Sequence, residues 1–204
     1  SFYKTALSNS RDPEAVKYQI LRVFQAQMLS KQQDHPGISY EVKKDITISK
    51  GAESLLFYRT VFEHPFKPGE EKMLYSLGGL MQLSNDIFDV YEDYKTGVQT
   101  LVTTAVKIKD LRFLYTALLE FGIDAAYRSG YPKYYVARFL ETISLGIFSR
   151  CYVCLDQLER NEKRSNGVFD PKSYSRKDLI CDMDTVGNKL RSLKYHLKIS
   201  RKFR

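Results

Sequence analysis

The stretch GGLMQLSNDIFDVYEDYKTG, residues 78–97, is central to the fold because its polar residues recur every three or four positions. On an α-helix that turns roughly 100° per residue, four of them fall within about 60° of one another. These four are Gln82, Asp86, Asp89 and Asp93. Apolar residues fill the opposite half, so the pattern predicts an amphipathic helix with one face of acids and amides.

That face has two interpretations. Most runs of charge are solvated surface, but a solvated face usually mixes signs because like charges one turn apart repel. No lysine or arginine lies between residues 73 and 94. Clustered carboxylates raise one another's pKa unless a cation neutralises them, and their oxygens suit hard ions such as Mg²⁺. The spacing therefore also fits a cation site.

Helical periodicity extends outward from this stretch along almost the whole chain. Breaks are indicated by HPFKPG at 64–69, SGYP at 129–132 and RSNGVFDP at 164–171. The one alternating strand pattern, at 44–48, is weak. We predict helices at about 12–33, 38–63, 70–95, 101–128, 132–164 and 175–200. The expected architecture is a single all-α domain over residues 1–204, a helical bundle of about six helices.

Composition narrows the class of protein. The 204 residues are 43% hydrophobic, which is enough for one substantial core. No apolar run approaches the roughly 18 residues of a membrane span. Three cysteines without secretory features predict reduced thiols and a cytoplasmic location, and the CxxC at 151–154 lies inside a helical pattern, which favours buried structural cysteines. The net charge of +8 suits a phosphate-bearing partner.

Residues 78–93 resemble the second metal-binding motif of the class I isoprenoid synthase superfamily. GGLMQLSNDIFD is similar to the form found in chain-elongating polyprenyl diphosphate synthases. The ND pair with its two later acids is similar to the terpene cyclase form, and the ED pair with the trailing KTG is similar to the squalene/phytoene synthase form. The shared element is a triad at i, i+4 and i+8, namely Asn85, Asp89 and Asp93.

The resemblance implies a prenyl diphosphate substrate and a Mg²⁺ cofactor. Asn85, Asp89 and Asp93 would be metal ligands, and the acids Asp86, Asp89 and Asp93 would be the catalytic set. The metal would neutralise the departing diphosphate. Chain elongation, head-to-head condensation and cyclisation all stay open, although the ED pair and KTG tilt the comparison toward squalene/phytoene synthases.

Three further residues would contact the substrate by the same resemblance: Gln82, Lys50 and Lys95. Lys50 begins the stretch KGAESLLFYRTVF, which resembles the prenyltransferase helix whose lysine points at the diphosphate. Each has a plain alternative. Lys50 would be a surface lysine, Gln82 a polar residue between helices, and Lys95 a favourable charge at a helix C-terminus.

The first acidic motif of that superfamily is missing, because Asp12, Asp34 and Asp45 are isolated from one another. The resemblance covers about residues 38–160, the later half of the fold. Three explanations compete: a fragment of a longer chain, a short homologue that completes its site across a homodimer, or a degenerate relative. We expect the fragment, because the sequence opens without Met. Half a bundle exposes its inner face, so it should pair with itself or with the missing half.

The alternative function is non-catalytic: a helical protein that binds a partner or a membrane surface. Its basis is the C-terminal segment NKLRSLKYHLKISRKFR, which is basic throughout. The plain interpretation is a final helix packed by Leu190, Leu193 and Leu197, with basic residues facing solvent. The functional one is peripheral contact with an anionic membrane. An RNA-binding module would rest on charge alone, so we expect no nucleic-acid partner.

Overall fold

The computed structural model describes residues 2–203 and confirms the all-α class: the elements in this range are helices, turns and loops, with no strand. No helix among these residues combines the length and the apolar character that crossing a membrane would demand. The helices are α1 (Phe2–Asn9), α2 (Pro13–Ser30), α3 (Tyr40–Thr60), α4 (Glu70–Phe88), α5 (Val90–Thr96), α6 (Ile108–Tyr127), α7 (Lys133–Ile143), α8 (Ser149–Arg164), α9 (Arg176–Leu179) and α10 (Val186–Ser200).

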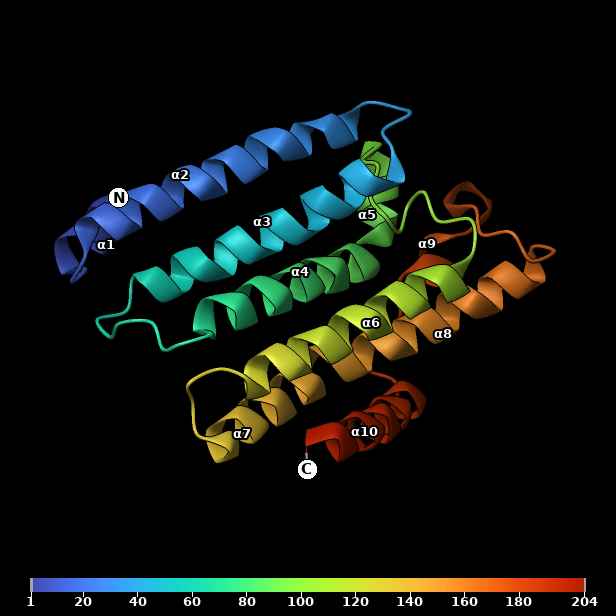
Figure 1. Ribbon diagram of the computed structural model, residues 1–204. Coiled ribbons are helices and arrows are strands. Elements are labelled where there is room, and N and C mark those ends of the chain that lie inside the picture. Colours follow the sequence, from blue (N-terminus) through green and yellow to red (C-terminus); the bar gives the residue numbers. More distant parts are fainter. Residues whose placement is uncertain (1, 204) are drawn as a thin grey trace.

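The long helices lie side by side in chain order (Figure 1). Helix α3 packs between α2 and α4, α6 packs between α4 and α8, and α10 lies against α8 at the far edge. Short connections make neighbouring helices antiparallel, as in up-and-down bundles. The central pair, α3 and α4, carries the acid-rich stretch and Lys50, so their packing decides the geometry of the candidate site.

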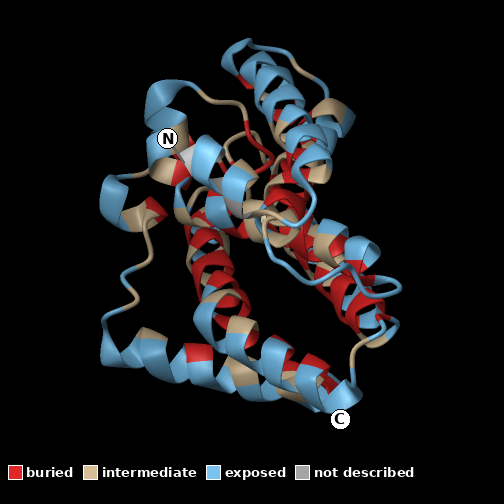
Figure 2. Ribbon diagram, turned by 90° about the vertical axis from the view of Figure 1, so that its left-hand side faces the viewer, coloured by how far each residue is buried: buried red, intermediate tan, exposed pale blue. Residues whose placement is uncertain are grey.

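The core lies between the facing sides of these helices, where Figure 2 shows the buried residues. The main cluster runs from Met73 on α4 to Phe203 beyond α10. Its centre includes Tyr115, which is fully buried and whose hydroxyl lies 3.2 Å from that of Ser84. A smaller cluster around Val16 and Phe57 joins α2 to α3. Helix α4 is thus fixed on two sides, by α3 and by the main core.

Glycines bring α3 and α4 unusually close together. A Cβ atom on Gly51 would lie 2.0 Å from the carbonyl oxygen of Gly78, and one on Gly78 would lie 2.6 Å from the Cα atom of Ala52. No side chain fits at either position, because real Cβ contacts are essentially never that short. This contact places the residues one turn before Gly51 on α3 beside those one turn after Gly78 on α4.

Two predicted helices are shorter than expected because side chains compete for backbone hydrogen bonds. Residues 101–107 are turns rather than the start of α6. The Thr100 hydroxyl accepts from the backbone N–H groups of Val102 and Thr103, and the Thr103 hydroxyl accepts from the N–H of Thr100. The segment predicted at 175–200 is divided into α9 and α10. Between them the Asp182 carboxylate accepts from the N–H of Asp184.

Other boundaries also differ. Helix α1 was not predicted, and the weak strand pattern at 44–48 lies inside α3. The predicted 132–164 helix is α7 and α8 joined by a π-helical turn at Ser144–Phe148. On α8, Cys151 and Cys154 are buried as predicted, and within the described range all three cysteines are free thiols.

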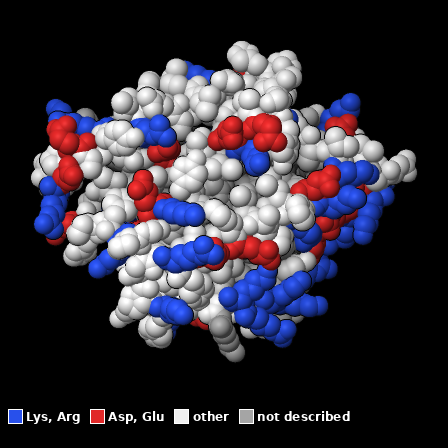
Figure 3. All heavy atoms as spheres, viewed as in Figure 1, with Lys and Arg blue, Asp and Glu red and all other residues white. Residues whose placement is uncertain are grey.

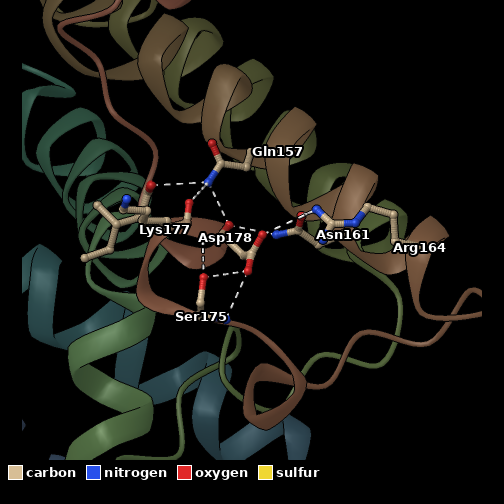
Figure 4. A network of polar contacts seen from close by, with 7 residues as sticks. Gln157, Asn161, Arg164, Ser175, Lys177 and Asp178 are labelled. Atoms are coloured by element: carbon tan, nitrogen blue, oxygen red, sulfur yellow. Dashed lines mark hydrogen bonds and ion pairs between the residues drawn. The ribbon is translucent and has the colours of Figure 1, made fainter.

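A polar network fastens α9 to α8 (Figure 4). The Gln157 amide donates to the carbonyls of Lys177 and Asp178 at 3.1 and 2.7 Å, and the Asn161 amide donates to that of Asp178 at 2.7 Å. Ser175 caps α9 by a reciprocal bond with Asp178. These contacts supply hydrogen bonds to carbonyl groups that have no partner within such a short helix. They therefore stabilise a helical turn of only four residues.

The prediction that leucines pack α10 onto the bundle is wrong. Leu190, Leu193 and Leu197 are exposed. The contact with α8 is made instead by Ser192, whose hydroxyl lies 2.8 Å from that of Ser149, and by Tyr195, which donates to Asp156 at 2.8 Å, together with buried Ile199. The bundle thus contacts the side of the helix that combines hydrogen-bonding side chains with Ile199, and the leucine side faces solvent.

Candidate functional site

The acid-rich stretch spans a break between α4 and α5, not one continuous helix as predicted. Asp89 lies at the junction with φ −97° and ψ 11°, outside the helical range. Aspartate has low helix propensity, which makes this position easier to break than its apolar neighbours. Helical hydrogen bonds continue on both sides: the N–H of Asp89 donates to Asn85 and that of Asp93 to Asp89, both at 2.9 Å. The chain therefore bends at Asp89 without forming a loop.

Asp86 is the buried centre of the site, with 5% of its surface exposed. Its carboxylate accepts from the Gln82 amide at 2.8 Å and from the Thr47 hydroxyl at 3.2 Å. Thr47 belongs to α3, so the close approach of α3 and α4 supplies this bond. Both contacts are neutral, and no ion pair to Asp86 is found among the described residues.

Burial raises the pKa of Asp86 to about 6, with a further rise from the charge of Asp89. The hydrogen bonds from Gln82 and Thr47 and the positive charge of Lys50 oppose this rise only in part. Burial also raises the pKa of Asp93 to about 6, reinforced by the charges of Asp86 and Asp89 and again opposed by Lys50. The three acids and Lys50 therefore share one electrostatic environment, and its negative charge is only partly compensated.

The outer part of the site is accessible. Asn85 and Asp89 are exposed, and the Asn85 amide donates to the Asp89 carboxylate at 3.0 Å. Among the described residues, no three Asp, Glu, His or Cys side chains are placed so that they alone could hold one metal ion. Magnesium commonly binds one or two carboxylates and completes its shell with water and substrate phosphates. Carboxylate and amide oxygens here have the chemistry for that mode.

Lys95 is not brought to the acids. It is exposed, and its ammonium nitrogen lies 5.9 Å from the centre of the Tyr91 ring. None of the interactions found for Lys95 in the described structure involves Asp86, Asp89 or Asp93. Of the three predicted substrate-contacting residues, Lys50 and Gln82 join the cluster and Lys95 does not.

Thr47 was missed from the sequence although a signal was present. Lys43, Thr47 and Lys50 follow the spacing i, i+4 and i+7, which places them on one face of α3. Lys43 is buried elsewhere on that face and donates to the Thr104 hydroxyl at 2.7 Å. A search for polar residues on the Lys50 face of α3 would have found Thr47.

The other ends of α3 and α4 carry a different feature. A hollow of about 430 Å³ lies there, lined mainly by apolar residues and by Arg59 and Glu70. The Arg59 guanidinium donates to Glu70 at 2.5 Å and to the carbonyls of His64 and Pro65 at 2.9 and 3.0 Å. Its donors are occupied in holding the α3–α4 loop, so the arginine is not free to bind a phosphate.

No protein-family model, curated protein or solved structure matches the chain. The class defined by the structure is an all-α bundle with a partly buried acidic cluster on which the charge of one lysine, Lys50, acts. The likeness to isoprenoid synthases rests on the sequence motif alone.

Proposed function

We propose that the protein binds a prenyl diphosphate through Mg²⁺ at this acidic cluster and promotes loss of diphosphate, followed by prenyl transfer or condensation. The observation that carries the proposal is the burial of Asp86 between α3 and α4, where Thr47 of α3 donates to it at 3.2 Å and the charge of Lys50 acts on both Asp86 and Asp93. A strongly perturbed carboxylate with a specific charged neighbour is typical of a functional site. The motif resemblance supplies the chemical class.

The side chains present fit a magnesium ion. Asn85, Asp89 and Asp93 would hold it, since they offer oxygen ligands and the first two are exposed. Bound magnesium would supply positive charge to the leaving diphosphate. Burial is the main cause of the raised pKa of Asp93, and the charges of Asp86 and Asp89 add to it, so a bound cation would favour the ionised form.

The roles of the remaining residues follow from their contacts. Lys50 would bind a diphosphate oxygen from the α3 side. Asp86 is buried and already holds two hydrogen bonds, so its proposed role is to keep negative charge behind the metal ligands. Gln82 uses its amide N–H on Asp86, and the proposal therefore limits it to positioning that carboxylate. Lys95 has no part, because its ammonium group lies over Tyr91.

The test is calorimetric titration of a non-ionising allylic diphosphate analogue, with and without Mg²⁺. We expect magnesium-dependent binding to the wild-type protein, lost in Asp89→Ala and weakened in Lys50→Ala. Glu92→Ala is the matched control, because it removes one exposed acid from the same segment, where Glu92 faces Arg176 at 4.0 Å. Absence of binding to the wild-type protein, or equal binding to Asp89→Ala, would overturn the proposal. Product analysis with one or two allylic diphosphates would then separate elongation, condensation and cyclisation.

A further inference from the structure

Helix α10 presents an apolar stripe to solvent. Its members are exposed by 73, 62, 46 and 57%, in chain order Val186, Leu190, Leu193 and Leu197. Their spacing of four, three and four residues is the a/d pattern of a coiled-coil seam. Isolated apolar residues are normal on surfaces, but a continuous stripe along a whole helix marks an interaction surface. We call these four residues the α10 seam.

The seam borders a hollow of about 770 Å³. Its apolar lining comes from the three leucines, and one side is formed by Tyr195 and by Asp156 of α8. Asp156 is already engaged by Tyr195 and by Arg112 at 2.8 and 2.7 Å. The surface is therefore a groove beside a helix, and a partner's side chains could fill it.

Basic residues surround the groove. Figure 3 shows Lys and Arg side chains gathered in the lower part of this face, where Figure 1 places α10. Those that line the hollow are Arg191, Lys194, Lys198 and Arg201. Lys194, Lys198 and Arg201 make no ion pair within the described part of the chain, and residues 186–203 include no acid. The positive charge at this surface is thus uncompensated.

The charges at the flanking positions decide the kind of partner. The e and g positions beside the α10 seam include Lys194 and Arg201, which make no ion pair within the described residues, and Lys189, which pairs with Asp184 at 3.6 Å. His196 also occupies a g position, but it is half-buried, with its ring nitrogen 3.2 Å from the Ser144 hydroxyl. In coiled coils these positions set partner choice through interhelical charge pairs. A second copy of α10 would place lysine and arginine against each other in either orientation. A helix with glutamate at its own e and g positions would be complementary.

We infer that α10 docks an acidic amphipathic α-helix of another protein, with apolar residues seated on the α10 seam and acids on its basic rim. A flat anionic membrane would satisfy the charge but would leave the groove unfilled. The inference does not depend on the proposed prenyl diphosphate site, which lies on α3, α4 and α5.

The test uses two synthetic helical peptides of equal length with leucine at a and d. One carries glutamate at every e and g position and the other carries lysine. Fluorescence anisotropy at low salt should show at least tenfold tighter binding of the glutamate peptide. The double variant Leu190→Ser/Leu197→Ser should lose at least tenfold of that affinity, whereas Leu21→Ser/Phe24→Ser, which alters two exposed apolar residues of α2, should not. Lys194→Glu/Arg201→Glu should reverse the preference.

Three results would overturn the inference. The first is failure of the glutamate peptide to bind, or equal binding of both peptides. The second is that neither peptide binds, whereas the wild-type protein sediments with phosphatidylglycerol vesicles and Leu190→Ser/Leu197→Ser does not. That result would assign the surface to membrane binding. The third is self-association that the same double variant abolishes, which would assign it to a second copy. Circular dichroism should confirm that the exposed substitutions leave the helices intact.

Discussion

Replacing Asp86 by asparagine should stabilise the protein at alkaline pH. The side chain keeps its shape, and the Gln82 amide can still donate to the oxygen that it contacts at 2.8 Å. The Thr47 hydroxyl can reverse its role and accept from the new amide. The substitution removes only the negative charge. In the native protein, the Asp86 carboxyl must ionise at a site where burial opposes ionisation.

The magnitude follows from the raised pKa. A rise from 3.8 to about 6 corresponds to about 3 kcal/mol, since one pKa unit is about 1.4 kcal/mol. Because the folded-state pKa is the higher one, the contribution of Asp86 to stability is most favourable below pH 3.8 and is lost as the pH rises through 6. Asp86→Asn should therefore exceed the wild type by about 3 kcal/mol at pH 8 and by only about 0.5 kcal/mol at pH 4.

Urea unfolding at pH 4, 6 and 8 measures this difference, and thermal unfolding at pH 8 should show a midpoint about 6 to 12 °C higher for the variant. Glu92→Gln is the control, because it removes the same charge from an exposed position of the same segment and should leave the pH profile unchanged. A variant less stable than the wild type at pH 8, or a difference that does not shrink toward pH 4, would refute the reasoning.

Three further outcomes can be measured by unfolding and sedimentation. Gly78→Ala should cost about 3 kcal/mol or more, because the new Cβ would meet the α3 backbone at 2.6 Å, whereas Gly146→Ala, with no atom within 4 Å, should be nearly neutral. Arg59→Ala should cost about 3 to 5 kcal/mol, because it leaves Glu70, which is 2% exposed, without its partner; a cost below 1 kcal/mol would contradict this. Half a bundle is expected to pair with itself or with a missing half; if it pairs with itself through the exposed apolar side of α2, Phe24→Ser should shift sedimentation toward the monomer, and a wild-type protein that already sediments as a monomer would contradict self-pairing.

The sequence was sufficient to predict most of the long helices, but it missed α1 and the breaks between helices. Amphipathic periodicity is a strong signal, and it located α2, α3 and the start of α4 within a few residues. The turn at 101–107 depends on threonine hydroxyls that bond their own backbone, and periodicity does not report such bonds. The bend at Asp89 is similar, because the helical hydrogen bonds continue on both sides of it.

The site was predicted in part for a related reason. The acid spacing along α4 and α5 is a local property, so Asp86 and its neighbours could be found in one stretch of sequence. The partners on α3 depend on how closely two helices pack, and Gly51 and Gly78 allow that approach. Lys50 was found only through the motif resemblance. The leucines of α10 were assigned to the core because an apolar stripe normally packs inward, but this helix joins α8 through hydrogen bonds of Ser192 and Tyr195 and leaves the leucines exposed.

The buried acids of the cluster differ from the other buried acids of the protein in how their charge is compensated. Glu70 faces Arg59 at 2.5 Å and Glu53 faces Arg22 at 2.6 Å, so burial of these glutamates is compensated by a direct ion pair. Asp86 has only neutral hydrogen bonds and a lysine that does not form an ion pair with it. Among the described residues, Asp86 and Asp93 are the acids with a raised pKa. The fold thus leaves charge uncompensated at the proposed magnesium site.

An external cation would complete the charge balance, and proton release measures this directly. At pH 6 each of Asp86 and Asp93 is about half protonated, so binding of magnesium with the diphosphate analogue should release up to about one proton from these two carboxyls, beyond the protons that the analogue itself loses to magnesium. At pH 8 both are ionised, and release should be close to zero. Calorimetric titration in two buffers of different ionisation enthalpy gives the number of protons released. If the analogue bound without a cation, its negative charge would raise the pKa of both acids further, and protons would be taken up at pH 6 instead of released.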